Sequence, residues 1–285
     1  MDTVGLVGVG HIGGLLLERL SDAGYAVVAH DADPDRQALA ADRGAETVDG
    51  PAAVGERADA VLLALPGAPE VTSVAVESGL LAALGAGGLL VDCSTTGPDA
   101  AETVATAAAD RGVAFVTAPV TRGGPGEGLH AMVGGSPADC EVAADLLDAV
   151  TLDRERVGTH ADAQRFKLLL QLRYAGQEAI DAEVVAAARD LGLPAEQYND
   201  LLDLDVSERL LEGDFSPAHV GMGGFAIWEK DLGYLLDATT DTRTAVPLAS
   251  EVQAAYRHAG QVKGEEERNS AAIIRHWQRM NGEDK

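Results

Sequence analysis

Residues 3–20 read TVGLVGVGHIGGLLLERL, which places a strand, a turn and the start of a helix in one short stretch. The turn contains the three glycines of a G-x-G-x-x-G pattern, Gly8, Gly10 and Gly13. In such turns the first glycine permits a tight bend, the second lets the backbone approach a pyrophosphate, and the third allows the helix to pack closely on the strand. Because the helix N-terminus then faces the phosphates, the stretch predicts a dinucleotide site.

His11 and Ile12 lie inside this turn and are expected to contact the dinucleotide, although an exposed loop position is an equally good interpretation of His11. A second apolar strand at residues 25–30 leads to Asp31, about twenty residues after the turn, where an acid binds the ribose 2′-OH. Such a carboxylate repels a 2′-phosphate, so the sequence predicts NAD rather than NADP as the cofactor. The alternative is a glycine-rich turn without a ligand.

Composition sets limits on the class of protein. The chain has 285 residues, of which 46% are hydrophobic, enough for a large core and roughly two domains. No stretch resembles a membrane span or a signal peptide, so a cytoplasmic location is expected. Cys93 and Cys140 lack C-x-x-C spacing and a clustered histidine, so neither a disulfide nor a metal site is expected.

The chain is strongly acidic, with 46 Asp and Glu against 21 Lys and Arg and a formal net charge of -25. Such a surface repels nucleic acid and anionic membranes, so neither is expected as a partner. The acids are dispersed along the chain, which favours a halophilic protein whose self-repulsion is screened by salt. An acidic mesophilic protein from a GC-rich genome is the alternative.

The pattern of apolar residues predicts alternating strands and helices in the first half of the chain and helices after it. The fold class is therefore α/β, with a Rossmann-type, doubly wound parallel sheet over residues 1–160 and an all-helical domain over 161–285. A single helix over about 161–191 is expected to join them, followed by helices at roughly 195–212, 225–239, 246–259 and 268–280. The expected strands are 3–8, 26–31, 45–48, 60–65, 88–92, 113–117, 129–134 and about 151–157.

Two loops at the ends of predicted strands carry further candidate residues. Leu65 and Pro66 end a buried strand in a Pro-Gly loop of the kind that lies over a cofactor. Ser94 and Thr95 end the strand at 88–92, just before Pro98 opens a helix. Each hydroxyl is a candidate for binding a ligand, and capping of the following helix is an equally good explanation.

Further motifs follow in the order and spacing of the β-hydroxyacid dehydrogenase family, which the chain resembles over nearly its whole length. They are the glycine turn, the Leu-Pro loop, and the segments DCST at 92–95, APVTRGG at 118–124, MVGG at 132–135, FKL at 166–168, KDL at 230–232 and VPL at 246–248. The resemblance implies an NAD(P)-dependent dehydrogenase with a Rossmann domain. It also implies a homodimer or homotetramer assembled through the C-terminal helices.

Lys167 matches the catalytic lysine of this family. A lysine beside a hydroxyl-bearing carbon can give a proton to the forming alkoxide or remove it in the oxidative direction, and its charge stabilises the oxyanion. A surface lysine on a long helix is the alternative, but the chain has only four lysines, Lys167, Lys230, Lys263 and Lys285. By the same resemblance Lys230 is expected to contact the cofactor, and Asp231 to orient charged groups beside it, with a solvated ion pair as the alternative.

The predicted substrate loop departs from the family pattern. Most members have Ser-Gly-Gly after Ala-Pro-Val, whereas this chain has Thr121, Arg122 and Gly123. Thr121 keeps the hydroxyl, and Arg122 adds a cation able to form a bidentate pair with a carboxylate, sulfonate or phosphate. Gln171 replaces the second Asn of the usual pair and lies one helical turn from Lys167. The arginine is similar to sulfolactaldehyde reductases, and the glutamine to threonate dehydrogenases.

The expected function is NAD-dependent hydride transfer to or from a small acidic hydroxy compound of the 3-hydroxyisobutyrate, sugar-acid or sulfonate type. Lys167 is the expected acid and base, while Ser94, Thr121, Arg122, Gly123, Gln171 and Asp231 are the candidate substrate residues. One alternative is an imine reductase of the same fold, which this lysine disfavours. The other is a catalytically silent dinucleotide sensor.

Overall fold

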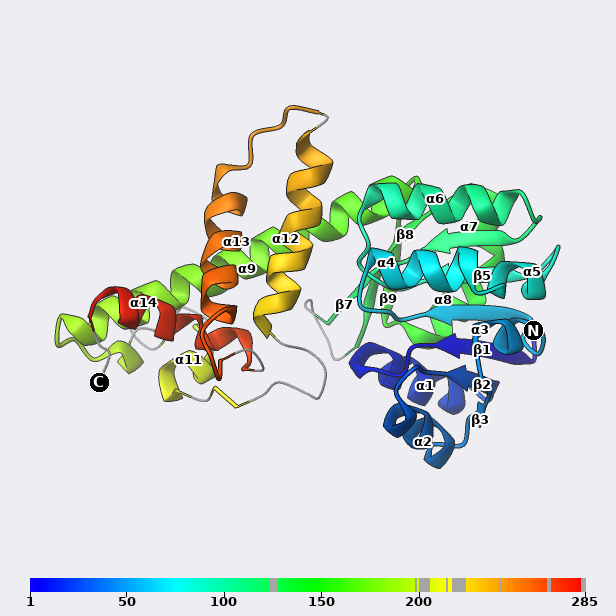
Figure 1. Cartoon of the computed structure of the whole chain (residues 1–285), viewed down its shortest axis with the longest axis horizontal. Coiled ribbons are helices and arrows are strands. Elements are labelled where there is room, and N and C mark those ends of the chain that lie inside the picture. Colours follow the sequence, from blue (N-terminus) through cyan, green and yellow to red (C-terminus); the bar gives the residue numbers. More distant parts are fainter. Residues whose placement is uncertain are drawn as a thin grey trace. The chain divides into compact units, whose positions relative to one another are not determined.

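The computed structural model describes residues 1–122, 128–197, 199, 206–213, 215–216, 224–240, 242–265 and 268–282 (Figure 1). Contacts divide the chain into two compact units, Met1–Lys167 and Leu168–Lys285. Among the described residues, no helix is long and apolar enough to cross a membrane.

The first unit alternates strands with helices. Its strands are β1 (Thr3–Val7), β2 (Ala26–His30), β3 (Glu46–Thr47), β4 (Ala60–Leu63), β5 (Leu89–Asp92), β6 (Ala114–Thr117), β7 (Val120–Thr121), β8 (His130–Gly134) and β9 (Asp153–Gly158). Its helices are α1 (His11–Asp22), α2 (Pro34–Asp42), α3 (Pro51–Gly55), α4 (Ala68–Thr72), the π-helical turn η1 (Ser73–Glu77), α5 (Leu80–Leu84), α6 (Pro98–Ala109), α7 (Pro137–Val142), α8 (Ala144–Val150) and the start of α9 (His160–Asp190). The eight predicted strands are present within two residues at each end, and β7 is an addition.

The strand order confirms the predicted fold class. From one edge it runs β3-β2-β1-β4-β5-β6, with every neighbouring pair parallel, which is the order of a dinucleotide-binding sheet. In such a sheet the ligand binds at the carboxyl ends of the strands, where the order reverses between β1 and β4. The turn after β1 and the loops after β4 and β5 therefore meet at this edge.

The expectation of a uniformly parallel sheet is wrong at the other edge. β8 runs antiparallel to both β6 and β7, and β9 is parallel to β8. The reason is the length of the connection, since β6 ends at Thr117 and β8 begins at His130. A parallel return needs a crossover of a dozen or more residues, usually a helix, whereas part of this connection is already used by β7.

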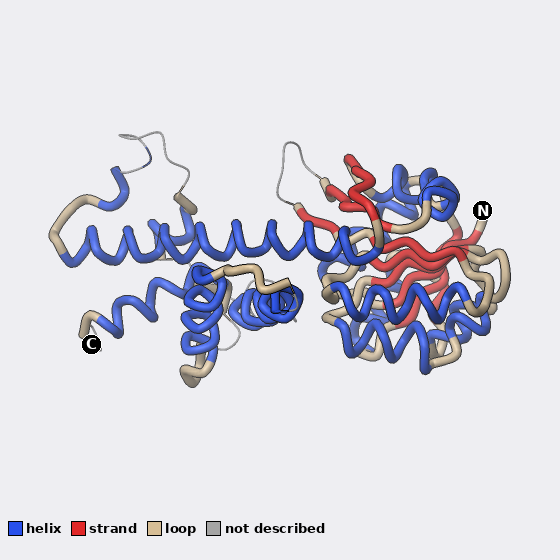
Figure 2. Tube along the Cα trace, turned by 90° about the horizontal axis from the view of Figure 1, so that it is seen from above, coloured by secondary structure: helices blue, strands red, loops and turns tan. Residues whose placement is uncertain are grey.

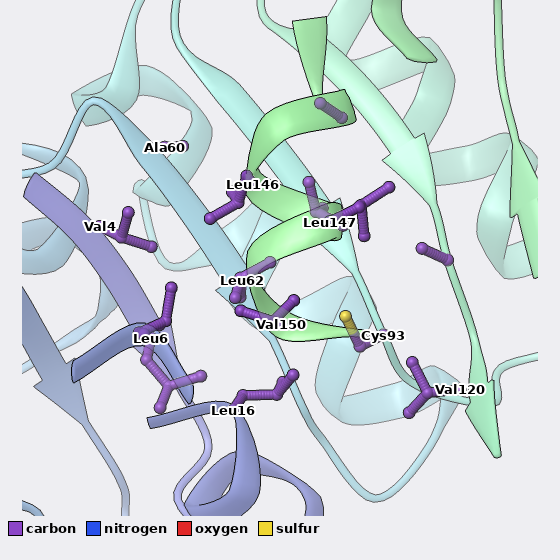
Figure 3. Packing of buried hydrophobic residues seen from close by; sticks show 14 of the residues in the cluster. Val4, Leu6, Leu16, Ala60, Leu62, Cys93, Val120, Leu146, Leu147 and Val150 are labelled. Atoms are coloured by element: carbon purple, nitrogen blue, oxygen red, sulfur yellow. The ribbon is translucent and has the colours of Figure 1, made fainter. Parts of the chain in front are cut away.

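Both faces of the sheet are covered, because alternate residues of each buried strand point to opposite sides. In β4, Ala60 and Leu62 belong to one apolar cluster, and Val61 and Leu63 belong to the other. Helices lie on both sides of the strands in Figure 2. Figure 3 shows one face, where Leu146, Leu147 and Val150 of α8 pack beside Leu62 and other residues of the strands.

α9 begins with a capping box. The backbone N–H of Thr159 donates to Oδ2 of Asp162 at 3.0 Å, and the N–H of Asp162 donates to Oγ1 of Thr159 at 3.2 Å. The backbone N–H and the hydroxyl of Thr159 both donate to this carboxylate, and these two hydrogen bonds lower the pKa of Asp162. The helix then continues for 31 residues, about 45 Å, without an internal proline.

The second unit is helical. It contains the rest of α9, η2 (Ala195–Gln197), α11 (Glu208–Glu212), α12 (Gly224–Thr240), α13 (Pro247–Gly260), η3 (Ser270–Ile273) and α14 (Ile274–Met280). The prediction of one helix over 195–212 is wrong at Val206 and Ser207, which are not helical. The side chain of Asn199 bonds to both the N–H and the C=O of Val206, at 3.0 and 2.9 Å, and so replaces helical hydrogen bonds.

A half-buried carboxylate joins the helices of this unit. Glu178 of α9 accepts hydrogen bonds from Nε1 of Trp228, the hydroxyl of Tyr256 and the hydroxyl of Ser270, at 3.0, 3.0 and 2.9 Å. Burial raises the pKa of Glu178 despite these donors. Trp228, Tyr256 and Ser270 come from α12, α13 and η3, so this one side chain links three elements to α9.

Candidate active site

The glycine turn has the geometry that the motif predicts. Gly8 adopts a φ of +92°, and a Cβ there would lie 2.3 Å from the carbonyl oxygen of Ala64. A Cβ at Gly13 would lie 1.9 Å from the carbonyl oxygen of Gly8. A side chain at Gly8 would therefore force the turn away from the end of β4, and one at Gly13 would force α1 away from the turn. Both glycines are required by the close approach of α1, β1 and β4.

Gly10 is the N-cap of α1 and makes no side-chain capping hydrogen bond. The nearest described atom to its missing Cβ is Nη1 of Arg36, at 3.4 Å. A turn with space beside the second glycine, at the positive end of a helix of 12 residues, fits the diphosphate of a nicotinamide dinucleotide. His11 and Ile12 form the first turn of this helix, and both are half-buried.

Asp31 directly follows β2 and holds the glycine turn in place. Its Oδ2 accepts the N–H of Val9 at 2.6 Å, and its Oδ1 accepts the N–H of Asp33 at 2.9 Å. Each carboxylate oxygen can accept a second hydrogen bond, so a ribose hydroxyl can still be bound. The sequence prediction included the ribose contact and missed this structural one.

Arg36 is a cation that the sequence prediction did not include at this turn. It comes from α2, five residues after Asp31, and its Nε pairs with Oδ2 of Asp33 at 3.6 Å. Its guanidinium lies beside Gly10. The helical spacing from Asp33 was the available signal, since residues three apart on a helix are neighbours.

The predicted loops after β4 and β5 are joined to each other. The hydroxyl of Ser94 accepts the N–H of Leu65 at 2.9 Å, and the N–H of Ser94 donates to Oδ1 of Asp92 at 2.9 Å. Ser94 is buried, Leu65 and Thr95 are half-buried, and Pro66 is exposed. Ser94 thus ties the two loops together, and its role toward substrate stays a prediction.

Gln164 was missed by the sequence prediction and is fully buried. Its Oε1 accepts the N–H groups of Thr96 and Gly97 at 3.1 and 3.4 Å, and its Nε2 donates to the carbonyl oxygen of Ser94 at 3.0 Å. The first of these contacts spans 68 residues of sequence, so no local pattern could indicate it. Gln164 connects the loop after β5 to the start of α9.

Lys167 lies one turn after Gln164 on α9 and is 5% exposed. A buried lysine is unusual, because removing an ammonium group from water is costly unless it serves a partner or a ligand. Its helix is attached through Gln164 to the loop that carries Thr95. The first unit therefore holds a buried amine one helical turn from a residue that is hydrogen-bonded to the loop after β5, at the carboxyl edge of the sheet.

The substrate loop follows β6. Thr121 ends the short strand β7, paired with His130 of β8, and Arg122 follows it at the surface. Nη1 of Arg122 lies 3.3 Å from Nε2 of His11. Gly123 lies outside the described residues. The predicted substrate loop is thus in contact with the glycine turn.

The second unit brings together three of the predicted residues. Nε2 of Gln171 donates to Oδ2 of Asp231 at 2.5 Å, and Nζ of Lys230 lies 2.8 Å from Oδ1 of the same carboxylate. Asp231 is 1% exposed, and Lys230 also lies over the ring of Tyr234 at 5.4 Å. Asp231 therefore orients both the amide and the ammonium group.

The comparison with protein families agrees with this geometry. Residues 3–158 match the model described as the NAD binding domain of 6-phosphogluconate dehydrogenase, more than half of the chain. The chain belongs to this family. A nicotinamide dinucleotide cofactor is supported by the match, which includes the glycine turn, Asp31 and the loops after β4 and β5.

Individual relatives confirm the resemblance to the β-hydroxyacid dehydrogenases and the prediction of an NAD-dependent dehydrogenase. The mitochondrial 3-hydroxyisobutyrate dehydrogenase of Bos taurus is 28% identical over 89% of this chain and 80% of its own length. The 2-(hydroxymethyl)glutarate dehydrogenase of Eubacterium barkeri is 26% identical over 98% of this chain and 96% of its own. A 3-hydroxyisobutyrate dehydrogenase structure from Salmonella typhimurium, 24% identical, covers 96% of this chain and 99% of its own with a TM-score of 0.85, which shows the shared fold.

Proposed function

We propose that the chain transfers a hydride between NAD and the carbinol carbon of a small acidic hydroxy compound. The observation that carries this proposal is the buried Lys167, whose helix is hydrogen-bonded through Gln164 to the loop after β5 of the dinucleotide-binding sheet. A dinucleotide sensor without chemistry has no use for a buried amine near that edge. NAD supplies or accepts the hydride, and the chain's own residues manage the proton and the charges.

Lys167 is the proposed general acid and base. In the reductive direction its ammonium group gives a proton to the carbonyl oxygen as that oxygen becomes an alcohol, and its charge stabilises the negative oxygen before the transfer. In the oxidative direction the neutral amine removes the hydroxyl proton. Burial supports this role because electrostatic interactions are stronger where water is excluded.

The acidic group of the substrate is assigned to Thr121, Arg122 and Gly123, with Ser94 and Gln171 as further polar contacts. The guanidinium of Arg122 can form two parallel hydrogen bonds with a carboxylate, sulfonate or phosphate. The amide of Gln171 is held by Asp231, which fixes its orientation. The proposed substrates are therefore hydroxy compounds of the 3-hydroxyisobutyrate, sugar-acid or sulfonate type.

NAD is the proposed cofactor in preference to NADP. Asp31 presents its carboxylate at the end of β2, where a 2′-phosphate would be repelled. Arg36 is a cation at the same turn, but its pairing with Asp33 offsets its charge. Lys230, oriented by Asp231, is proposed as a further cofactor contact on the basis of the family resemblance.

The test is a binding titration followed by a turnover assay on the same preparation. NAD and NADP are titrated separately, and a panel of hydroxy acids, sulfonates and their aldehydes is then screened by the absorbance of the reduced nicotinamide. Turnover with higher kcat/KM for NAD than for NADP supports the proposal. Tight NAD binding without turnover of any compound on the panel would favour the sensor.

A homodimer through the second unit is also proposed. Leu169, Ile180 and Val184 are 54%, 55% and 38% exposed, and at 3.6 residues per turn they share one face of α9. An exposed apolar stripe of this length is typical of an interface. Ile180→Arg should reduce the sedimentation coefficient to that of a monomer, whereas Leu152→Arg, at an exposed leucine of the first unit, should leave it unchanged. A monomeric wild-type protein would contradict this assembly.

A further inference from the structure

The three hydrogen bonds of Gln164 enclose Thr95. Its Nε2 holds the carbonyl oxygen of Ser94, immediately before Thr95, and its Oε1 holds the N–H of Thr96, immediately after it. Thr95 is half-buried, whereas the residues on either side of it are buried. The loop is thus fixed on both sides of Thr95, which is its one partly exposed residue.

The same amide also binds the backbone at the start of α6. Gly97 is the N-cap of α6 and makes no side-chain capping hydrogen bond, and its φ is +82°. Oε1 of Gln164 accepts the N–H groups of Thr96 and Gly97, at 3.1 and 3.4 Å. A distant side chain therefore binds the N-cap N–H of α6, the donor that a glutamate or glutamine at the third helical position binds in a capping box.

Gln164 is also connected to the loop after β4 and to the helical turn that carries Lys167, the proposed base. Ser94, whose carbonyl is held by Gln164, accepts the N–H of Leu65 through its hydroxyl. Lys167 lies three residues after Gln164 on α9. Residues three apart on a helix are neighbours, so the two side chains lie on nearby faces of α9. One amide thus links both cofactor loops of the first unit to the helical turn that carries the lysine.

We propose that Gln164 is a positioning residue, which sets the place of the Ser94–Gly97 loop, and of Thr95 within it, relative to Lys167. This inference rests on the proposed function of Lys167 and on the predicted ligand contact of Thr95. The chemistry requires an amide, because the loop presents one acceptor and two donors to a single buried side chain. A glutamate carboxylate can accept but cannot donate, and asparagine is too short by one methylene to keep all three contacts.

A small shift of the loop is expected to have a large effect on turnover. A displacement of about 1 Å between reacting groups can reduce the rate on the order of 10²-fold. For Gln164→Ala we expect kcat, per NAD-binding site, to fall by about that factor, while KM for the hydroxy compound changes much less. Gln164→Glu, which retains the acceptor, is expected to show a smaller loss.

The experiment compares these variants of the full chain with wild type and with Gln177→Ala. Gln177 is an exposed glutamine of the same helix whose hydrogen bonds run to Arg173 and Asp181. Active sites are counted by NAD titration, so that loss of folded protein is separated from loss of rate. Amide hydrogen exchange of peptides that cover residues 94–98 is measured in parallel, and faster exchange is expected for Gln164→Ala and not for Gln177→Ala.

Two results would overturn the inference. One is a kcat per site in Gln164→Ala within about threefold of wild type, and the other is unchanged exchange in the loop. If Gln164→Ala does not fold, the same two measurements on Gln164→Met, which keeps most of the side-chain volume and none of the three hydrogen bonds, decide. If wild type turns over no substrate, the proposed function fails instead, and the exchange data still show whether Gln164 holds the loop.

Discussion

Nη1 of Arg122 lies 3.3 Å from Nε2 of His11, across 111 residues of sequence. A guanidinium is only a donor, so Nε2 of His11 accepts and the imidazole carries its proton on Nδ1 in this contact. His11 is the first residue of α1, the helix whose N-terminus is proposed to face the dinucleotide phosphates. The arginine proposed to bind the substrate is thus in contact with the turn proposed to bind the cofactor, so a change at Arg122 can affect the binding of both.

Replacing Lys167 tests the proposed chemistry. Lys167→Ala should lower kcat on the order of 10²–10⁴-fold, the range for a positioned acid and base, while the Kd for NAD stays nearly unchanged. Added methylamine should restore part of the rate, because a small amine can enter the space that the side chain leaves. Steady-state kinetics with the best substrate of the panel measure both effects.

Lys263→Ala is the matched control, since Lys263 is an exposed lysine of the second unit. Its kcat should equal that of wild type. A folded Lys167→Ala variant with near wild-type kcat would remove Lys167 from the mechanism.

His160 gives the first unit a pH-dependent stability. Its ring stacks on Phe115 with centroids 4.8 Å apart and its Nδ1 lies 3.2 Å from Oγ1 of Thr117, and burial lowers its pKa from 6.5 although Glu102 and Asp139 act to raise it. As pH falls below about 6.5, the unfolded chain takes up this proton before the folded chain does. The free energy of unfolding should therefore decrease until pH falls below the folded-state pKa.

The variant His160→Gln removes this titration. Thermal melting of wild type and variant between about pH 7.5 and 5.5 should show a Tm difference that shrinks as pH falls, because only wild type loses the His160 contribution. The lost stacking on Phe115 lowers the Tm of the variant by an amount that does not depend on pH. A Tm difference that stays constant across this range contradicts the prediction.

Much of the fold follows from local patterns. The glycine turn, the apolar strands and the helix over about 161–191 are set by residues close together in sequence, and these predictions agree with β1, α1 and α9. The antiparallel β8 and the break at Val206 depend on a short connection and on one side chain, Asn199, which composition does not indicate.

Residues of the candidate site could be predicted from the sequence where the residue type alone indicates a chemical role. A lysine in a chain with four lysines, or an acid after a strand, stands out in the sequence. Gln164 and Arg36 do not, because their significance comes from contacts with the Ser94–Gly97 loop and with Gly10. Such contacts exist only after the chain has folded.

The net charge predicts stabilisation by salt. If every Lys and Arg were paired with an acid, 25 acidic residues would still remain unpaired at pH 7. Their mutual repulsion is screened as ionic strength rises, so Tm should increase from low salt to molar KCl. Exposed ion pairs such as Arg257 with Glu229 are weakened by the same screening, but each contributes only about 0–1 kcal/mol.

Sucrose series are the control, because a non-ionic solute stabilises by exclusion from the surface without screening charge. A larger rise of Tm in KCl than in sucrose, concentrated at low ionic strength, supports halophilic adaptation. A Tm that is flat or falls with KCl contradicts it.

Arg122 is the last residue to test, and the most informative about substrate. If it binds the acidic group, Arg122→Ala loses a charge-assisted contact of about 1.5–3 kcal/mol, which is roughly 10–150-fold in kcat/KM. The loss should be larger for a substrate with a sulfonate or second carboxylate than for an analogue with an uncharged head. Arg122→Lys should recover only part of it, because an ammonium cannot reproduce the planar fork.

The contact with His11 supplies the competing outcome. If the guanidinium serves the diphosphate at α1 instead, Arg122→Ala raises KM for NAD and lowers kcat/KM equally for charged and uncharged substrates. The deciding quantity is therefore the ratio of kcat/KM between the two substrates, measured in wild type, Arg122→Ala and Arg122→Lys. Arg111→Ala is the control for lost surface charge. Arg111 is an exposed arginine that donates to the carbonyl oxygen of Ala107 at the end of α6. An Arg122→Ala ratio equal to that of wild type and of this control would assign Arg122 to the cofactor or to solvent, and not to the substrate.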